Sequence, residues 1–382
     1  MSVTAKAKSG FRSDEEDLLR RGRKLISESI EHGVTSMRAH VEVDTIVGLS
    51  GIDAALQLKE EFKSVCDIQI AGKLNLIVAR PSISRSTAPA FAQERLFSSV
   101  DDSEPGENYH LLLEAIDRDG VEVIGSAPYV EASIAHAKTN LVLILEAASS
   151  RSLHVDFHLD YNLDATSEPL IYELIARVKE AGHNRPGRHP KRRITIGHAT
   201  RLQLFTVEQW RDLMERIGDL PITFIALPNS DMYMQGREAT NTPLGAPRST
   251  LRVPYLAREY GLEVAMSVNN VGNAFTPQGS LDPLALCPFG VAIFQAATPK
   301  DLETLLRSVT ITSKVALGME DVSPDLYPQV GDQADFVILH GNETLTQAAL
   351  NPSYDRTTIK AGVIVAQRQT ERFIYGRPSR VF

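Results

Sequence analysis

Short stretches in which apolar and polar residues alternate recur along the chain, separated by segments with apolar residues at helical spacing. Alternation with a period of two predicts β-strands, whereas apolar positions three or four residues apart predict amphipathic helices. The predicted strands of this series cover residues 34–43, 66–72, 121–127, 153–160, 193–199, 222–228 and 262–268. The predicted helices cover residues 13–33, with a capping box at Ser13 and Glu16, and residues 52–62, 169–182 and 206–218.

This alternation of strands and helices predicts an α/β fold with a parallel sheet, a TIM-type (β/α) barrel. Seven strands can be counted where a closed barrel has eight. We therefore expect a ring that is broken between the strands at 36–43 and 262–268. Unpaired strand edges need cover, so the residues before Ser13, or a second copy of the chain in a homo-oligomer, are expected to shield the gap.

The C-terminal part of the chain has a different pattern of apolar and polar residues. Residues 334–341 and 357–367 alternate with no helical pattern between them, which predicts a small antiparallel unit. Residues 80–106 are rich in Ser, Pro and charge, which predicts a long loop. We expect two parts, a barrel domain over residues 1–325 and C-terminal strands with a tail over residues 326–382.

Bulk composition narrows the class of protein. The net charge of −8 argues against a nucleic-acid partner, because phosphate binding favours basic surfaces. The sequence has no apolar run near the roughly 18 residues of a membrane span, and its first ten residues lack the apolar segment of a signal peptide. The two cysteines, Cys66 and Cys287, suit a reducing compartment. We expect a cytoplasmic protein that binds a small molecule and no membrane.

Polar residues gather where the predicted strands end, which is where barrel enzymes carry their active residues. A row of polar residues on the inward face of a strand is uncommon unless they are hydrogen-bonded or functional. The Asn-rich stretch after the last strand also fits a turn, and the letters PNSD at 228–231 also fit a helix N-cap. The candidates in chain order are His154, Asp156, His158, Asp160, His198, Asn229, Gln235, Asn269, Asn270 and Asn273.

Seven motifs in order make the chain similar to the cytosine-deaminase-like branch of the amidohydrolase superfamily, and more closely to fungal metallo-dependent-hydrolase-like proteins. They are RAHVEVD (38–44), GSAPYVE (125–131), HLDYNLD (158–164), GHATRL (197–202), MQGR (234–237), NNVGNAFTPQGS (269–280) and GDQADFVILHG (331–341). The resemblance extends from about Ser13 to Tyr375. It implies that the last segment belongs to the small β-sandwich of that family.

The resemblance implies metal-assisted hydrolysis or deamination, in which a bound divalent ion lowers the pKa of a water molecule to about 7. His158 matches the fifth-strand metal ligand of the family, and His198 matches its sixth-strand histidine. The family also takes two ligands from an H-x-H motif on its first strand, and this motif occurs nowhere in the chain. We therefore expect the first strand to be missing, and at most one zinc or iron ion, bound weakly or not at all.

Two further departures concern the acid and the base. Tyr161 stands where cytosine deaminase has its general acid–base Glu, and Asn269 stands where it has its ligand and base Asp. Asn is a poor zinc ligand and no base. His40 shares a strand face with Arg38, a cation that disfavours a metal ion nearby, whereas Asp160 follows His158 closely enough to act as a third ligand. We expect slow deamination of cytosine, or none.

Three interpretations remain open from the sequence. The first is a hydrolase or deaminase acting on C–N bonds of a small cyclic or amide metabolite with a degenerate metal site. The second is a metal-independent enzyme of secondary metabolism that uses Tyr161 and His198, and the third is an inactive binding or scaffold protein. The predicted catalytic residues are His198, Tyr161 and Asp160, with His158 and His198 at the metal. The predicted substrate-binding residues are His40, Asn229, Gln235, Asn269, Asn270 and Asn273.

Overall fold

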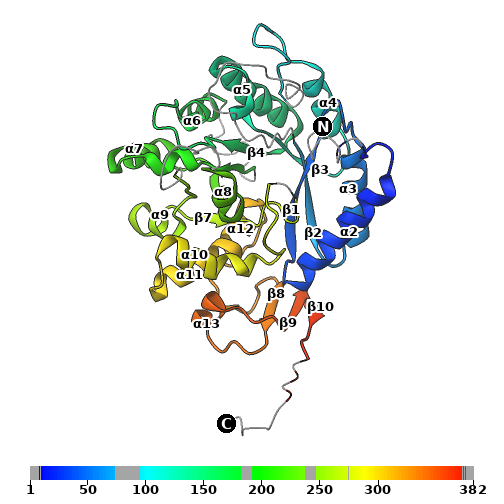
Figure 1. Ribbon diagram of the computed structural model, residues 1–382, viewed down its shortest axis with the longest axis vertical. Coiled ribbons are helices and arrows are strands. Elements are labelled where there is room, and N and C mark those ends of the chain that lie inside the picture. The colour runs from blue at the N-terminus through cyan, green and yellow to red at the C-terminus, as the bar shows by residue number, and fades with distance from the viewer. Residues whose placement is uncertain are drawn as a thin grey trace.

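A computed structural model describes residues 10–73, 95–181, 192–236, 247–273 and 275–371, together with Lys8, Phe373 and Tyr375. Its main feature is a parallel sheet of seven strands hydrogen-bonded in chain order from β1 to β7. Figure 1 shows this sheet curled, with helices on its outer side. The strands are β1 (Ser36–Glu42), β2 (Asp67–Lys73), β3 (Val121–Ser126), β4 (His154–Leu159), β5 (Ile194–His198), β6 (Ile222–Ala226) and β7 (Val264–Met266).

The helices follow the strands in the order that the periodicity indicates, with several more beyond those predicted. The α-helices are α2 (Glu15–Glu31), α3 (Ser50–Phe62), α4 (Glu107–Ile116), α5 (Ile134–Arg151), α6 (Ile171–Glu180), α7 (Val207–Ile217), α8 (Pro228–Met234), α9 (Val253–Tyr260), α10 (Leu286–Phe294), α11 (Pro299–Val309), α12 (Ile311–Ala316) and α13 (Leu345–Leu350). Single 3-10 turns lie at η1 (Pro128–Val130), η2 (Thr200–Leu204) and η3 (Pro283–Ala285).

The prediction of seven parallel strands is confirmed, and they form a half-barrel. Within the described residues no ladder joins β7 to β1, so the sheet is open on that side. Two carbonyl groups at the end of α12 bind side chains of β1 and β2: Ala316 accepts a hydrogen bond from Arg38, and Leu317 accepts one from Gln69. Lys8 forms ion pairs with Glu42 and Asp44 next to the end of β1.

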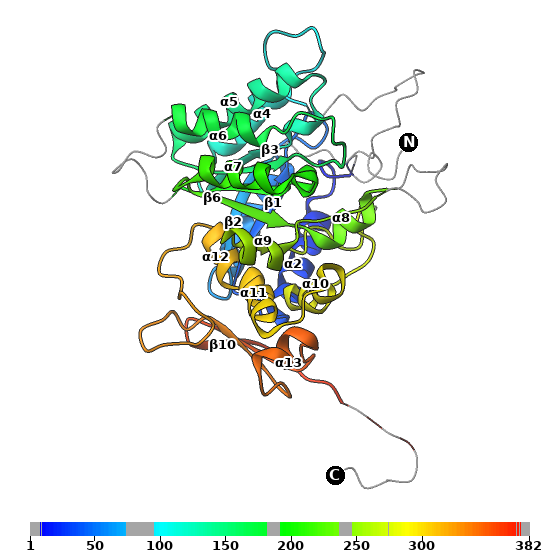
Figure 2. The same ribbon diagram turned by 90° about the vertical axis from the view of Figure 1, so that its left-hand side faces the viewer.

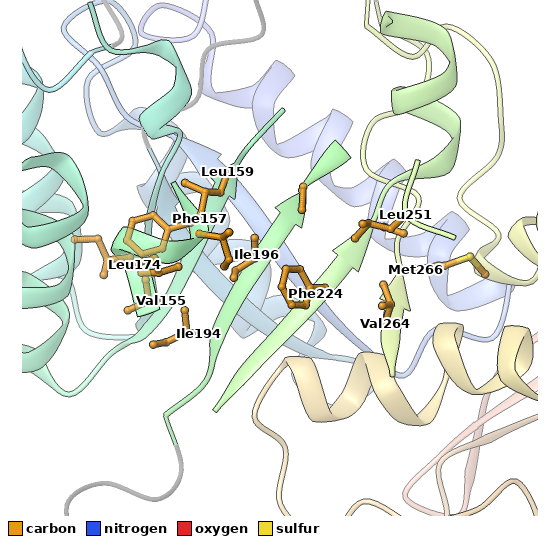
Figure 3. Packing of buried hydrophobic residues seen from close by; sticks show 14 of the residues in the cluster. Val155, Phe157, Leu159, Leu174, Ile194, Ile196, Phe224, Leu251, Val264 and Met266 are labelled. Atoms are coloured by element: carbon orange, nitrogen blue, oxygen red, sulfur yellow. The ribbon is translucent and has the colours of Figure 1, made fainter. Parts of the chain in front are cut away.

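The two faces of the sheet differ in polarity, which decides where the core and the site lie. On β4, Val155 and Phe157 point to the helices and are buried with Leu174 of α6 (Figure 3). The alternate residues Asp156 and His158 point to the inside of the half-barrel and are also buried. The apolar outer face stabilises the fold by burial, so the inner face is left to polar side chains.

The ends of the predicted elements needed small corrections. Helix α2 is capped by Asp14, whose side chain accepts from the amide of Asp17, so the predicted capping box at Ser13 was wrong. The carboxylate one residue later is an equally good N-cap. The capping box of α7 pairs Thr206 with Gln209, inside the helix predicted at 206–218.

The predicted loop at 80–106 is only partly described, since residues 80–94 lie outside the described part of the chain. Residues 95–106 carry two buried apolar side chains, Leu96 and Phe97, and therefore pack against the barrel. In the described parts of the chain, no helix combines the length and the apolar character that a membrane span requires. Cys66 and Cys287 are both free thiols and buried.

A second, three-stranded antiparallel sheet follows, with β8 (Phe336–Leu339), β9 (Arg356–Lys360) and β10 (Val363–Arg368). It lies at one end of the molecule, beside α2 and α13 (Figures 1 and 2). The expectation of no intervening helix was wrong, because α13 lies between β8 and β9. The segment predicted as one strand at 357–367 is a hairpin that turns at Ala361 and Gly362, both with positive φ.

The small sheet is fixed to the barrel by a buried ion pair. The guanidinium of Arg356 donates to both carboxylate oxygens of Asp282, each at 2.7 Å, and to the carbonyl of His32. Removing one partner of such a buried pair typically costs about 3–5 kcal/mol. The division at residue 325 and the assignment of these strands to a β-sandwich remain predictions.

Candidate active site

His158 and His198 lie side by side at the C-terminal ends of two neighbouring strands, β4 and β5. Their ring centroids are 4.8 Å apart, with the rings nearly perpendicular. In the sheet His158 pairs with Gly197, and a side chain at Gly197 would place its Cβ 2.8 Å from the ring carbon Cδ2 of His158. The glycine therefore makes room for the first imidazole, and the structure brings the two predicted histidines together.

His198 is held by a buried carboxylate. Its Nδ1 lies 2.6 Å from Oδ1 of Asp231, and the hydroxyl of Thr250 donates to the other carboxylate oxygen at 2.7 Å. An ionised carboxylate only accepts hydrogen bonds, so Nδ1 carries the proton, and in the neutral imidazole Nε2 then keeps its lone pair. His198 has φ +68°, an unusual backbone conformation for a residue with a side chain. Such strain is often found at functional sites.

Two tyrosines form an aromatic wall next to this histidine. The ring of Tyr161 stacks on His198 with a centroid distance of 3.9 Å, and Tyr129 meets Tyr161 edge to face at 5.7 Å. Tyr129 belongs to η1, directly after β3. Both rings therefore come from the same end of the half-barrel as the histidines, where loops that follow parallel strands converge.

The opposite wall carries amides. Asn269, with φ +66°, donates from its side-chain amide to the hydroxyl of Ser230 at 2.8 Å. Asn270 lies beside it on the same pocket. The space enclosed by the pocket is about 10 Å³, room for roughly one water molecule, so a larger ligand requires the lining side chains to move. It is lined by Tyr129, His158, Tyr161, His198, Ser230, Met234, Asn269, Asn270 and Phe275.

Other predicted residues have different surroundings. Both carboxylate oxygens of Asp160 accept from backbone amides, those of Leu170 and Ile171 at the start of α6. Asp160 therefore stabilises a helix terminus, where a carboxylate is favoured, and the structure does not bring it into the pocket as a base or third metal ligand. Burial raises its pKa to about 6.

Three predicted substrate-binding residues form hydrogen bonds that stabilise the loops around the pocket. The side chain of Asn273 accepts from the amides of Phe275 and Thr276, the turn interpretation of the Asn-rich stretch. The side chain of Gln235 accepts from the amide of Ser249, and the carbonyl of Asn229 accepts from Gln278. None of the three is among the residues that line the described pocket.

Below the pocket, a network of charged side chains centres on Asp156. Its Oδ2 accepts from Arg38 at 2.8 Å and from Thr195 at 2.6 Å, and it lies 3.2 Å from Nε2 of His40. Its Oδ1 accepts from the ammonium group of Lys73 at 3.1 Å. Arg38, His40 and Lys73 are inward-facing residues of β1 and β2, so alternation on three strands directs all of them to one carboxylate.

The network sets the charge of its members. Burial opposes ionisation of Asp156, but Lys73, His40 and Arg38 hold the pKa of that carboxyl well below its usual range. Burial lowers the pKa of Lys73 to about 8 and the charge of Asp156 opposes this, so the ammonium form predominates at pH 7. Burial, and next the charge of Lys73, hold the pKa of His158 well below its usual range, which keeps this imidazole neutral.

Comparisons with known proteins find deaminases and amidohydrolases among the proteins to which this chain is similar. No protein-family model matches the chain. It is 27% identical to a pterin deaminase of Rhizobium rhizogenes strain K84 over 222 residues, which are 58% of this chain and 47% of the relative. It is 22% identical to N-isopropylammelide isopropyl amidohydrolase of Pseudomonas sp. strain ADP over 312 residues, 81% of this chain and 63% of that one.

Among solved structures, 5-methylcytosine deaminase from Klebsiella pneumoniae superimposes with a TM-score of 0.74 at 22% identity, covering 94% of this chain and 77% of that one. The chain shares its fold. The chain spans less than two thirds of the length of the two relatives matched by sequence. The predicted similarity to deaminases and amidohydrolases is thereby confirmed at the level of structural neighbours, whereas the finer assignment to the fungal branch and the missing first strand remain predictions.

A divalent metal, which the resemblance implies, can be tested against the side chains present. His40, Asp156 and His158 each offer a ligand atom, and these atoms lie within 4.8 Å of one another. However, Lys73 and Arg38 already bind the two oxygens of Asp156. A metal ion would therefore join two cations around one carboxylate in a buried place, where repulsion is weakly screened. The group does not fit a divalent ion while Lys73 is charged.

Three important residues were not among the predicted catalytic or binding residues. Asp231, which pairs with His198, stands among the polar residues that follow the predicted strand at 222–228, in letters that also fit a helix N-cap. Tyr129 follows a predicted strand directly, and that position was the available signal. Lys73 directly follows the strand predicted at residues 66–72, at a position that faces inward. A lysine at such a position is buried, and that was the available signal.

Proposed function

We propose that the chain is a hydrolase that acts on a C–N bond of a small cyclic, nitrogen-containing metabolite bound in the described pocket. The observation that carries this proposal is the pairing of His198 with Asp231 beside Tyr161. A histidine oriented by a buried carboxylate, with its second nitrogen unprotonated, is the arrangement of a general base. A protein that only binds ligands has no need of such a pair, so the pair favours catalysis over a scaffold role.

Two aromatic side chains at the pocket favour a flat ring as the ligand. Tyr161 and Tyr129 supply aromatic faces against which a single heterocycle would stack once the lining side chains have moved apart. Asn269 and Asn270 each carry a donor and an acceptor, which suits the mixed edge of a nitrogen heterocycle. Nδ1 of His158 is buried and has no hydrogen-bond partner among the described residues, so it offers a further polar contact to a ligand.

The proposed reaction uses groups of this chain. Nε2 of His198 accepts a proton from a water molecule as the water oxygen bonds to the ring carbon. The C–N bond to the exocyclic amine then breaks, and a proton returns from His198 to the leaving nitrogen, releasing ammonia or an amine. Asp231 stabilises the imidazolium formed between the two steps. Tyr161, stacked on His198, is the proposed donor to the ring nitrogen, and it regains a proton from the new hydroxyl group as the carbonyl of the product forms.

The test is a panel of amino-substituted pyrimidines, triazines and pterins, the ring classes in the names of the relatives. Release of ammonia or amine is measured with purified protein, and each compound is also tested for its effect on the thermal unfolding temperature. We expect at least one compound to be hydrolysed, and His198→Asn to lower kcat by about a hundredfold or more. Cytosine itself is expected to react slowly, because Tyr161 and Asn269 stand where the resemblance places the acid–base Glu and the base Asp of cytosine deaminase.

The outcomes separate the interpretations. A compound that raises the unfolding temperature of the wild type but is never hydrolysed would indicate a binding protein. Hydrolysis that His198→Asn leaves unchanged would place the chemistry elsewhere. If no compound binds and none is hydrolysed, the proposal of a heterocycle pocket is wrong.

A further inference from the structure

The ammonium group of Lys73 lies among three side chains that are suited to a metal ion. Its Nζ is 3.1 Å from Oδ1 of Asp156, and Nε2 of His158 is 4.0 Å from the same oxygen. His40 faces the second oxygen of this carboxylate at 3.2 Å. The four groups therefore surround one small volume beneath the pocket, with the lysine side chain fully buried.

Burial of this lysine needs an explanation. A buried ammonium is costly unless it is paired, and Lys73 binds a carboxylate that Arg38 already neutralises. Asp156 therefore has two cationic partners, and the inside of the half-barrel holds one positive charge more than this carboxylate balances. A structural role alone would be met by Arg38, which also donates to Thr195 and to the carbonyl of Ala316.

The position of the excess charge is the second observation. Lys73 lies at the end of β2 and binds the carboxylate oxygen that is nearer to the imidazole of His158, whereas Arg38 binds the other oxygen. We propose that the ammonium group of Lys73 takes the place of a metal ion in the cluster of His40, Asp156 and His158. The wild-type cluster then binds no divalent ion, and it becomes a metal site when the charge of Lys73 is removed.

The role of Lys73 in catalysis rests on the proposed function, but the metal-binding test does not depend on enzyme activity. In the proposed enzyme, Lys73 is a positioning residue that acts through Asp156 and His158, because it does not line the pocket. It supplies a fixed positive charge beneath the bound ring, where a metal-dependent enzyme would have an ion. The site would then need no metal from its surroundings.

The experiment compares zinc binding by the wild type, Lys73→Met, His158→Ala and the double variant Lys73→Met/His158→Ala. Met keeps the length and the apolar stem of lysine and removes the charge. The matched control is Lys59→Met, which removes a lysine from an ion pair with Glu122 on the surface side of α3. Tag-free proteins are dialysed against buffered Zn²⁺ and analysed for metal, and Co²⁺ spectra report histidine ligation.

We expect Lys73→Met to bind one Zn²⁺ per chain, at least about a hundredfold more tightly than the wild type, because it loses a like charge a few ångströms away. The double variant should lose this ion, and Lys59→Met should match the wild type. The proposal is overturned if folded Lys73→Met binds no more zinc than the wild type. If Lys73→Met does not fold, the zinc contents of the wild type and of His158→Ala are compared instead. A zinc ion that the wild type holds and His158→Ala lacks would equally overturn the proposal, whereas equal zinc contents of these two proteins support it.

Discussion

Replacing Asp231 by Asn tests the central feature of the site. The substitution keeps the shape of the side chain and removes its charge. Asp231 is fully buried and binds His198 at 2.6 Å and Thr250 at 2.7 Å. Because of this burial, little water is available to take over the interactions of the carboxylate. A hydrogen bond to a charged group contributes about 1.5–3 kcal/mol. The variant loses this stabilisation of the imidazolium that forms in the reaction, which corresponds to a fall in kcat of about 10- to 150-fold.

The assay is the initial rate of ammonia or amine release from the best compound of the panel, with thermal unfolding measured first to show that the variant is folded. Asp212→Asn is the matched control, because Asp212 pairs with Arg216 on the exposed face of α7. It should leave the rate unchanged. The reasoning also requires that Asp231→Asn has almost no further effect in a His198→Asn background, since the carboxylate acts through that histidine. Effects that simply multiply would refute it.

Three further predictions concern neighbouring residues. Tyr161→Phe should keep the ring stacked on His198 and lower kcat by about a hundredfold if the hydroxyl donates a proton, with the unfolding temperature as the control. Gly197→Ala should displace His158, because its Cβ would lie 2.8 Å from the ring; we expect about 1–3 kcal/mol lower stability in denaturant unfolding and loss of ligand-induced stabilisation. Because burial raises the pKa of Asp160 from 3.8 to about 6, the folded state holds a proton that the unfolded state releases. The contribution of Asp160 to the unfolding free energy should therefore fall by up to about 3 kcal/mol as the pH rises through this window, and Asp160→Asn should remove this part of the pH dependence.

The sequence alone determined the number, order and direction of the barrel strands. Each strand packs its helix side against the core, which is fully buried on β2 to β7 and partly buried on β1. Apolar residues therefore recur at every second position, and this local rule identifies β1 to β7 without any tertiary information. The same rule placed His158 and His198 at strand ends and on the inner face, which is why the structure brings them together. Helix boundaries were less certain, because Ser13 and Asp14 are both good caps and packing selects one of them.

The tertiary structure decided which polar groups bind one another. His198 and Asp231 are 33 residues apart, and Lys73 and Asp156 are 83 apart, so no local pattern pairs them. The contact of Lys73 with Asp156 depends on the curl of the sheet, which turns inward-facing side chains from several strands toward one centre, whereas Asp231 reaches His198 from α8, which follows β6. The sequence likewise shows Asp160 next to a strand end, but only the path of the chain into α6 reveals that its carboxylate is used by two backbone amides. Local periodicity reports which face a residue occupies, and the charge and partners of that residue follow from the folded geometry.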